Sequence, residues 1–229
     1  ARFSTDDFNG ESQEGAGLYQ VTCKKGSRWS VADAYIRPAL TRSNLTLRME
    51  AFVTRIEIDG NRATGVTYES RGETHTVRAN AEIVLSGGAI NSPQTLMLSG
   101  IGPGAHLREM GIEVKVDSSG VGQNLQDHPA SGLLYYTQKT SDLAEYLSLT
   151  NVMKWKAAGR GPLVSNVGES GGFFASRDGL ATPDLQVHVA PTGFYDNGIH
   201  EPVRKAVTMA ATLVRVESSG QIKLRSADP

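Results

Sequence analysis

The spacing of apolar residues in the first half of the chain predicts an antiparallel meander. Apolar residues alternate over residues 45–53, and the phase then shifts to Ile56 and Ile58, as it does where a strand contains a β-bulge. Asp59-Gly60 follows, and glycine allows the positive φ of a tight hairpin turn. Two more strand-like runs complete the pattern, at residues 63–68 and 74–79.

A different kind of strand is predicted at residues 81–85. This run is short and mostly apolar, which is typical of a strand buried on both faces of a parallel sheet. It ends in Gly87-Gly88, and we expect a helix to follow with Ser92 as its N-cap, Pro93 as its first residue and Gly100 at its end. A strand, a small-residue turn and a helix let the backbone approach a nucleotide, although the full Gly-X-Gly-X-X-Gly fingerprint is absent from the sequence.

The remainder of the chain has the pattern of a short helix and strand followed by an α+β region from about residue 129. The expected helices span residues 104–110 and 143–158, and the expected strands span residues 112–116, 172–175, 185–190, 206–216 and 221–224. The predicted fold class is therefore α/β plus α+β, with a parallel strand and a β-meander in the first part and an antiparallel sheet in the second.

Composition and charge exclude several classes of protein. The 229 residues include 23 Lys+Arg and 24 Asp+Glu, a balance that argues against a protein that binds nucleic acid or anionic membranes by charge. No apolar run approaches the roughly 20 residues of a membrane span, so we expect a soluble, cytoplasmic chain, with peripheral membrane association of a longer parent left open. Cys23 is the only cysteine, which excludes an internal disulfide. The chain starts at Ala1 without a methionine and ends directly after a predicted strand, so we expect a piece of a longer polypeptide.

Two motifs of candidate chemistry give weak signals. The five histidines contain no pair at the i, i+4 spacing of a helical metal site, so we expect no metal. His188 lies in a strand-like run where an imidazole needs a partner, and both a structural and a functional role are open. Residues 168–172 match the Gly-X-Ser-X-Gly nucleophile elbow, but an elbow needs a preceding strand and a following helix, so a serine hydrolase is only a remote alternative.

Longer segments resemble a known family. Residues 88–103 resemble the second signature of the glucose-methanol-choline (GMC) flavoprotein oxidoreductases, with Thr95 where an aliphatic residue is usual. Residues 120–128 are similar to the family segment that follows. Further agreement lies at residues 7–10, 13–17, 26–30, 218–220 and 224–226. The resemblance spans essentially the whole chain and includes the choline- and alcohol-oxidising members.

This resemblance implies an FAD-binding part and a substrate-binding part. Residues 1–40 would form a substrate-domain or interdomain segment, 41–128 part of the FAD-binding domain, and 129–229 the substrate-binding domain. The backbone at Val53 matches the position that holds the adenine. The residues that would lie against the adenosine half of FAD are Gly87, Gly88 and Ala89.

The resemblance also assigns two residues to the substrate. Glu169 matches a glutamate that faces the quaternary ammonium of choline, and His188 matches a histidine that helps to hold the alcohol. We expect both side chains on the same side of the antiparallel sheet, with Glu169 partly buried. Val167 and Gly168 stand where choline-oxidising members have tryptophans, which favours a less cationic alcohol.

The implied function is oxidation of a primary alcohol, choline-like or neutral, to an aldehyde by hydride transfer to flavin. The family's pyrophosphate-binding loop and active-site histidine would lie before Ala1 and after Pro229. We therefore expect FAD in the parent enzyme but not in this piece, which is expected to be inactive alone and to self-associate through exposed apolar surface. The alternative is a flavin-free binding or structural module that uses the same half-fold.

Overall fold

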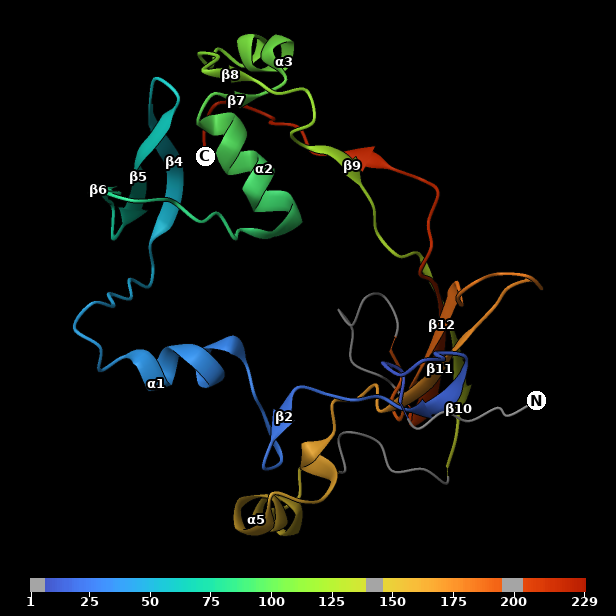
Figure 1. Cartoon of the computed structure of the whole chain (residues 1–229). Helices are drawn as coiled ribbons and strands as arrows, with labels where there is room; N and C mark the ends of the chain where they lie inside the picture. The colour runs from blue at the N-terminus through green and yellow to red at the C-terminus, as the bar shows by residue number, and fades with distance from the viewer. Residues whose placement is uncertain (1–6, 139–145, 195–203) are drawn as a thin grey trace. The chain divides into compact units, whose positions relative to one another are not determined.

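A computed structural model describes residues 7–138, 146–194 and 204–229 (Figure 1). The chain divides into two units, which are described separately. Unit 1 comprises residues 1–45 and 128–216, and unit 2 comprises residues 46–127 and 217–229.

Unit 1 is built on a five-stranded antiparallel sheet with the strand order β1-β11-β12-β13-β10. The strands are β1 (Gly15–Leu18), β10 (Ala130–Tyr136), β11 (Ser170–Phe174), β12 (Leu185–Ala190) and β13 (Ala206–Leu213). The predicted strand at residues 185–190 is confirmed without change, whereas that at 206–216 ends three residues early. The antiparallel sheet expected from the second half of the sequence is present, and it also takes in β1 from the first twenty residues.

The two faces of this sheet differ in burial. On one face of β13, Ala206, Thr208 and Thr212 are buried. Thr208 donates a hydrogen bond to the carbonyl oxygen of Thr192 over 2.7 Å and accepts one from the backbone N–H of Phe194. The segment after β12 therefore covers this face at the middle of β13. On the other face large apolar side chains are exposed, including Leu133 (58%), Tyr135 (57%) and Met209 (42%).

A small hairpin and a helix complete unit 1. The hairpin joins β2 (Cys23–Lys24) to β3 (Ser27–Arg28), and it is followed by a π-helical segment (Ala32–Ile36) and α1 (Arg37–Ala39). The helix α5 (Leu149–Ala158) precedes a 3-10 turn (Pro162–Val164). It begins later than predicted because Ser148 caps it, accepting from the N–H of Asn151; residues 143–145 of that prediction lie outside the described residues.

The hairpin turn packs against the end of α5 through two glycines. Gly26, at φ 72°, lies so close to Gly159 that a Cβ atom on it would overlap the Gly159 carbonyl. Trp155 donates its indole N–H to the Gly26 carbonyl oxygen over 2.8 Å. Backbone packing and one side-chain hydrogen bond thus hold together two elements far apart in the sequence.

Unit 2 contains the predicted meander. Its strands are β4 (Phe52–Asp59), β5 (Arg62–Ser70) and β6 (Glu73–Arg78), paired antiparallel in that order. The register shifts between Val53 and Arg55, which confirms the bulge predicted from the phase of the apolar residues. Residues 45–51 are not a strand, and three of the apolar residues that suggested one, Leu45, Leu47 and Met49, are exposed.

The helix α2 (Gly88–Leu98) contacts β4 in the core of unit 2. The Ser99 hydroxyl, at the end of α2, accepts a hydrogen bond from the backbone N–H of Ile56 over 2.9 Å, and both residues are buried. Met97 on α2 is fully buried, as is Leu107 on α3 (Gly104–Glu109). Short strand pairs complete the unit: parallel β7 (Ile101–Gly102) with β8 (Val116–Asp117), and antiparallel β9 (Gln123–Leu125) with β14 (Gly220–Gln221).

Three predictions in unit 2 need correction. Residues 81–85 are not a strand, and Val84 is 77% exposed, because no other strand of the described chain pairs with this segment. The helix begins at Gly88 rather than after a Ser92 cap, and Pro93 lies inside it, where proline costs one backbone hydrogen bond near the N-terminal end. Of the strand predicted at residues 112–116, only Val116 lies in a strand, the two-residue β8.

The predicted ends of both helices in this part are confirmed. Gly100 (φ 86°) and Gly111 (φ 74°) have the left-handed backbone that closes a helix, and each directly follows the C-cap residue, Ser99 of α2 and Met110 of α3. The domain bounds expected from the sequence put residues 217–229 with the sheet of unit 1, whereas the structure groups them with unit 2.

Candidate functional site

His188 lies on β12, the central strand of the unit 1 sheet. It is paired with Gly171 on β11 and with Ala210 on β13. The imidazole is half-buried, and this loss of contact with water lowers its pKa below the usual value of about 6.5. Near neutral pH the ring is therefore uncharged and can donate one hydrogen bond and accept another.

Tyr19, directly after β1, is an aromatic neighbour of His188. The two rings lie 5.4 Å apart between centroids, tilted by 39°. The Tyr19 hydroxyl donates to the carbonyl oxygen of Val187 over 2.6 Å and accepts from the Gln186 side-chain amide over 3.4 Å. Sequence reasoning missed Tyr19, because only the pairing of β1 with β11 brings it next to β12.

Glu169 lies immediately before β11. Its carbonyl oxygen accepts the backbone N–H of Tyr19 over 2.9 Å, which continues the β1–β11 ladder by one residue. Glu169 precedes Gly171 by two residues, and Gly171 is paired with His188, so the pleat puts Glu169 and His188 on the same face of the sheet.

The carboxylate of Glu169 is exposed, contrary to the expected partial burial. Among the described residues none forms a hydrogen bond or ion pair with it. The physical reason is its place at the end of a strand, after a loop in which Val167 has a φ of 73°. A carboxylate there keeps its hydration and is available to a ligand.

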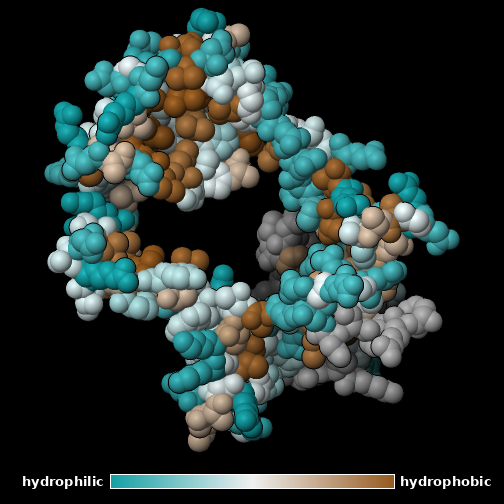
Figure 2. All heavy atoms as spheres, viewed as in Figure 1, coloured by the Kyte–Doolittle hydropathy of each residue, from teal (hydrophilic) through white to brown (hydrophobic). Residues whose placement is uncertain are grey.

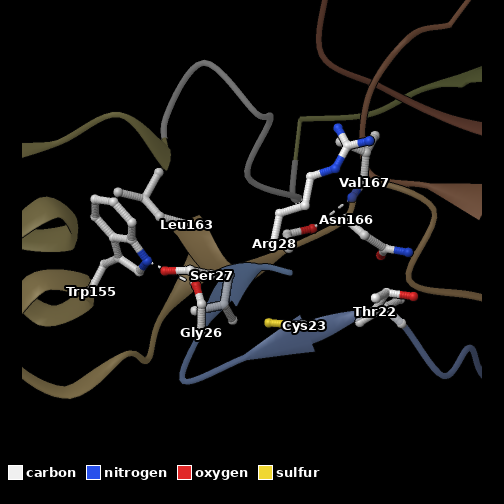
Figure 3. Close-up of a pocket in the computed structure, with 12 residues that line it drawn as sticks. Thr22, Cys23, Gly26, Ser27, Arg28, Trp155, Leu163, Asn166 and Val167 are labelled. Carbon is white, nitrogen blue, oxygen red and sulfur yellow. Dashed lines mark hydrogen bonds between the residues drawn. The ribbon is translucent and has the colours of Figure 1, made fainter. Parts of the chain in front are cut away.

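A pocket of about 610 Å³ lies beside this loop (Figure 3). The β2–β3 hairpin forms one wall, and Trp155 and residues 163–167 form the other. Figure 3 shows the Arg28 side chain directed toward Val167 and Asn166. A guanidinium, an amide and the Thr22 hydroxyl beside an indole ring suit a ligand with one polar and one apolar end. The family resemblance covers residues 26–30 and Val167, but the pocket itself could not be predicted, since its walls come from two distant segments.

The residues expected at the adenosine all belong to unit 2. Val53 is on β4 and 39% exposed, while Gly87, Gly88 and Ala89 form the exposed start of α2. No side chain caps this helix end, Gly88 has a φ of 84°, and a Cβ on it would point into open space, away from other parts of the described chain. In Figure 1, β4 and α2 run in the same direction, so the start of β4 and the start of α2 are at the same end of the unit. Open backbone of this kind fits a nucleotide.

Two other kinds of site can be assessed from the described residues. Ser170 begins strand β11 instead of standing between a strand and a helix, so the nucleophile-elbow geometry is absent from this segment. Within residues 7–138, 146–194 and 204–229, no cluster of three or more His, Cys, Asp or Glu side chains is arranged to hold a metal ion. In the same residues, none of the helices combines the length and the apolar character needed to cross a bilayer.

Curated proteins that resemble this chain include several choline dehydrogenases. The oxygen-dependent choline dehydrogenase of Sinorhizobium medicae (strain WSM419) is 43% identical over 235 residues, which cover 98% of this chain and 42% of that protein. The mitochondrial choline dehydrogenase of Homo sapiens is 41% identical, with 98% of this chain and 39% of that protein covered. The chain thus spans about two-fifths of the length of these relatives.

The fold and the sequence profile agree with these matches. A structure of formate oxidase from Aspergillus oryzae RIB40 superposes with a TM-score of 0.82 at 25% identity, covering 96% of this chain and 44% of the other. The sequence profile described as GMC oxidoreductase matches residues 1–130, more than half of the chain. The chain therefore belongs to the GMC oxidoreductase family.

Proposed function

We propose that the protein containing this chain is an FAD-dependent oxidoreductase that oxidises a primary alcohol to an aldehyde. The observation that carries the proposal is the half-buried, neutral imidazole of His188 in the middle of an antiparallel sheet, with an unpaired carboxylate, Glu169, on the same face. Relatives named choline dehydrogenase, which match 98% of the chain at 41–43% identity, support the alcohol as the substrate class.

In this proposal unit 1 binds the alcohol and unit 2 contributes to the FAD site. His188 bonds the substrate hydroxyl, because a neutral imidazole can donate to an oxygen that becomes more negative as its proton leaves. Glu169 stands at the edge of the same face, where its charge acts on the far end of the substrate.

The exposed backbone of unit 2 would hold the adenosine half of FAD. Val53 would bond the adenine through its backbone, and the start of α2 at Gly87, Gly88 and Ala89 would lie against the ribose side without a Cβ at the two glycines to obstruct it. When bound, FAD supplies the acceptor for the hydride that leaves the alcohol carbon.

The structure of the loop before β11 bears on which alcohol is bound. Val167 and Gly168 provide no aromatic ring where choline-oxidising members have tryptophans. A carboxylate attracts a quaternary ammonium through charge, yet the strength of that attraction falls when water surrounds the carboxylate, as it does at the exposed Glu169. We therefore propose a neutral or weakly cationic alcohol rather than choline itself.

Kinetics of the full-length enzyme test both roles. His188→Ala should lower kcat and kcat/KM together, by roughly ten- to a thousandfold, because it removes a donor that matters most in the transition state. Glu169→Gln should raise KM for choline more than KM for a neutral alcohol of similar size, which it should change little. Equal effects of Glu169→Gln on the two substrates would make the glutamate structural.

The cofactor assignment has its own test. Purified full-length protein should show the visible absorption of oxidised flavin, bleached on addition of the alcohol. A colourless full-length protein without extractable flavin would instead support a flavin-free binding module built on the same half-fold.

A further inference from the structure

We infer that Tyr19 is a positioning residue for His188: its hydroxyl fixes the Val187–His188 peptide, and its ring fixes the imidazole. The inference rests on the proposed function, in which His188 contacts the substrate. It assigns a role to a residue outside the segments that resemble the family's site.

The first observation concerns Gly171, which faces His188 across the β11–β12 pair. A Cβ atom on Gly171 would overlap the carbonyl oxygen of Val187 and would lie 2.5 Å from the Tyr19 hydroxyl oxygen. A Cβ projects away from the plane of a sheet, so an oxygen at that place is also displaced from the plane. The carbonyl of Val187 is therefore tipped toward the face that carries Tyr19 and His188, and only glycine at position 171 leaves room for it.

The second observation is that Tyr19 supplies the partner for this displaced carbonyl. The 2.6 Å hydrogen bond from the Tyr19 hydroxyl satisfies the Val187 oxygen. Because the carbonyl of Val187 and the N–H of His188 belong to one planar peptide, this bond also sets the orientation of the His188 backbone. The imidazole then packs against the Tyr19 ring at 5.4 Å.

Tyr19 is itself held firmly enough to act in this way. Its ring contacts Phe8 at 5.0 Å and Phe173 at 6.3 Å between centroids, and Phe8 is buried, with 5% exposed. Its backbone N–H is bonded to Glu169. A single residue thus connects the backbone of Glu169, the peptide of Val187 and the ring of His188.

Few charged groups share this environment. In the described part of the sheet, this face carries Tyr19 after β1, Glu169 before β11, Asp184 before β12 and Tyr136 on β10 as further titratable residues, and β13 presents Thr208, Ala210 and Thr212. The Asp184 carboxylate is bonded to Ser176, and Tyr136 lies two strands away from His188, so a change in the titration of His188 after substitution of Tyr19 would mainly reflect exposure to water and the charge of Glu169.

The test uses the full-length holoenzyme in a double-mutant cycle. Tyr19→Phe keeps the ring and removes the hydroxyl, and it should lower kcat/KM for the alcohol by about three- to thirtyfold through misplacement of His188. In a His188→Ala background the same change should have less than a twofold effect, since residues that act as a unit are non-additive. Tyr35→Phe is the matched control: this tyrosine is 73% exposed and should be silent in both backgrounds.

A second measurement covers the case in which substitution weakens folding. Tyr19→Leu removes the ring from beside His188, so the pKa of His188, followed by histidine NMR, should rise toward its usual value, while Tyr19→Phe should leave it nearly unchanged. Two results together would overturn the inference. Tyr19→Phe would lower kcat/KM by the same factor with and without His188, and Tyr19→Leu would leave the pKa of His188 unchanged. If His188→Ala alone leaves alcohol oxidation intact, the proposed function fails instead.

Discussion

At the scale of single residues, the lowered pKa of His188 makes stability depend on pH. Burial favours the neutral imidazole in the folded state, so below about pH 6.5 the unfolded chain binds more protons than the folded one. The contribution of the neutral His188 to the free energy of unfolding is therefore fully present above that pH, and it is lost as the pH falls through the lower, folded-state pKa. We expect the Tm of the wild type to fall relative to that of His188→Gln between about pH 7 and pH 5.

Thermal denaturation of the two proteins over this range checks the prediction. Between about pH 7 and pH 8, where the imidazole is neutral in both states, the difference in Tm should stay constant. A difference in Tm that is the same at all these values would mean that His188 titrates as it does in the unfolded chain.

The secondary structure at these residues could be predicted from the sequence, whereas their exposure and contacts could not. His188 lies in the predicted strand because alternating apolar residues around it leave little choice of structure. The exposure of Glu169 and the contact of Tyr19 with His188 could not be predicted, because both depend on which strands pair, and β1 joins β11 across about 150 residues of chain.

At the scale of elements, the edge position of β4 in the meander has an energetic consequence. Alternate N–H groups of an edge strand point away from the sheet, and the Ser99 hydroxyl at the end of α2 accepts that of Ile56 in a buried position. Ser99→Ala leaves that N–H without a partner, which costs about 1–3 kcal/mol. Urea denaturation followed by circular dichroism should show this loss, whereas Ser119→Ala, at an exposed serine, should change the free energy of unfolding little.

The element boundaries that were predicted well are those at which glycine takes a positive φ. The hairpin at Gly60 and the helix ends at Gly100 and Gly111 follow from the positive φ values that glycine allows. Residues 81–85 show the opposite case. Their apolar run is suited to a parallel sheet, but a strand exists only when a neighbour supplies hydrogen bonds, and local sequence contains no information about that neighbour.

At the scale of the whole molecule, unpaired apolar surface is the main feature. Leu133, Tyr135 and Met209 share one exposed face of the unit 1 sheet, and Figure 2 shows apolar atoms at the surface of unit 2 in the region of α2 and β4. Exposed patches of this kind lead to association in water. We expect the 229-residue chain to sediment as oligomers at micromolar concentration, and the double change Leu133→Ser and Tyr135→Ser to shift it toward monomer.

Analytical ultracentrifugation over a range of concentrations measures the oligomeric state, with Thr74→Ser at an exposed position of β6 as a control. A wild-type chain that remains monomeric would contradict the prediction. The grouping of residues 217–229 with unit 2 could not be predicted, because the chain reaches them only after it has passed through all five strands of the unit 1 sheet.

The contact between the hairpin turn and α5 also determines what fluorescence can report. The chain has two tryptophans, Trp29 and Trp155, and both belong to unit 1. Lys24 lies 4.5 Å from the Trp29 ring, and the indole of Trp155 is hydrogen-bonded to Gly26. The surroundings of both tryptophan rings therefore depend on the position of the β2–β3 hairpin. Intrinsic tryptophan emission is therefore a selective probe of this one region, and it will remain unchanged by events confined to the meander and α2.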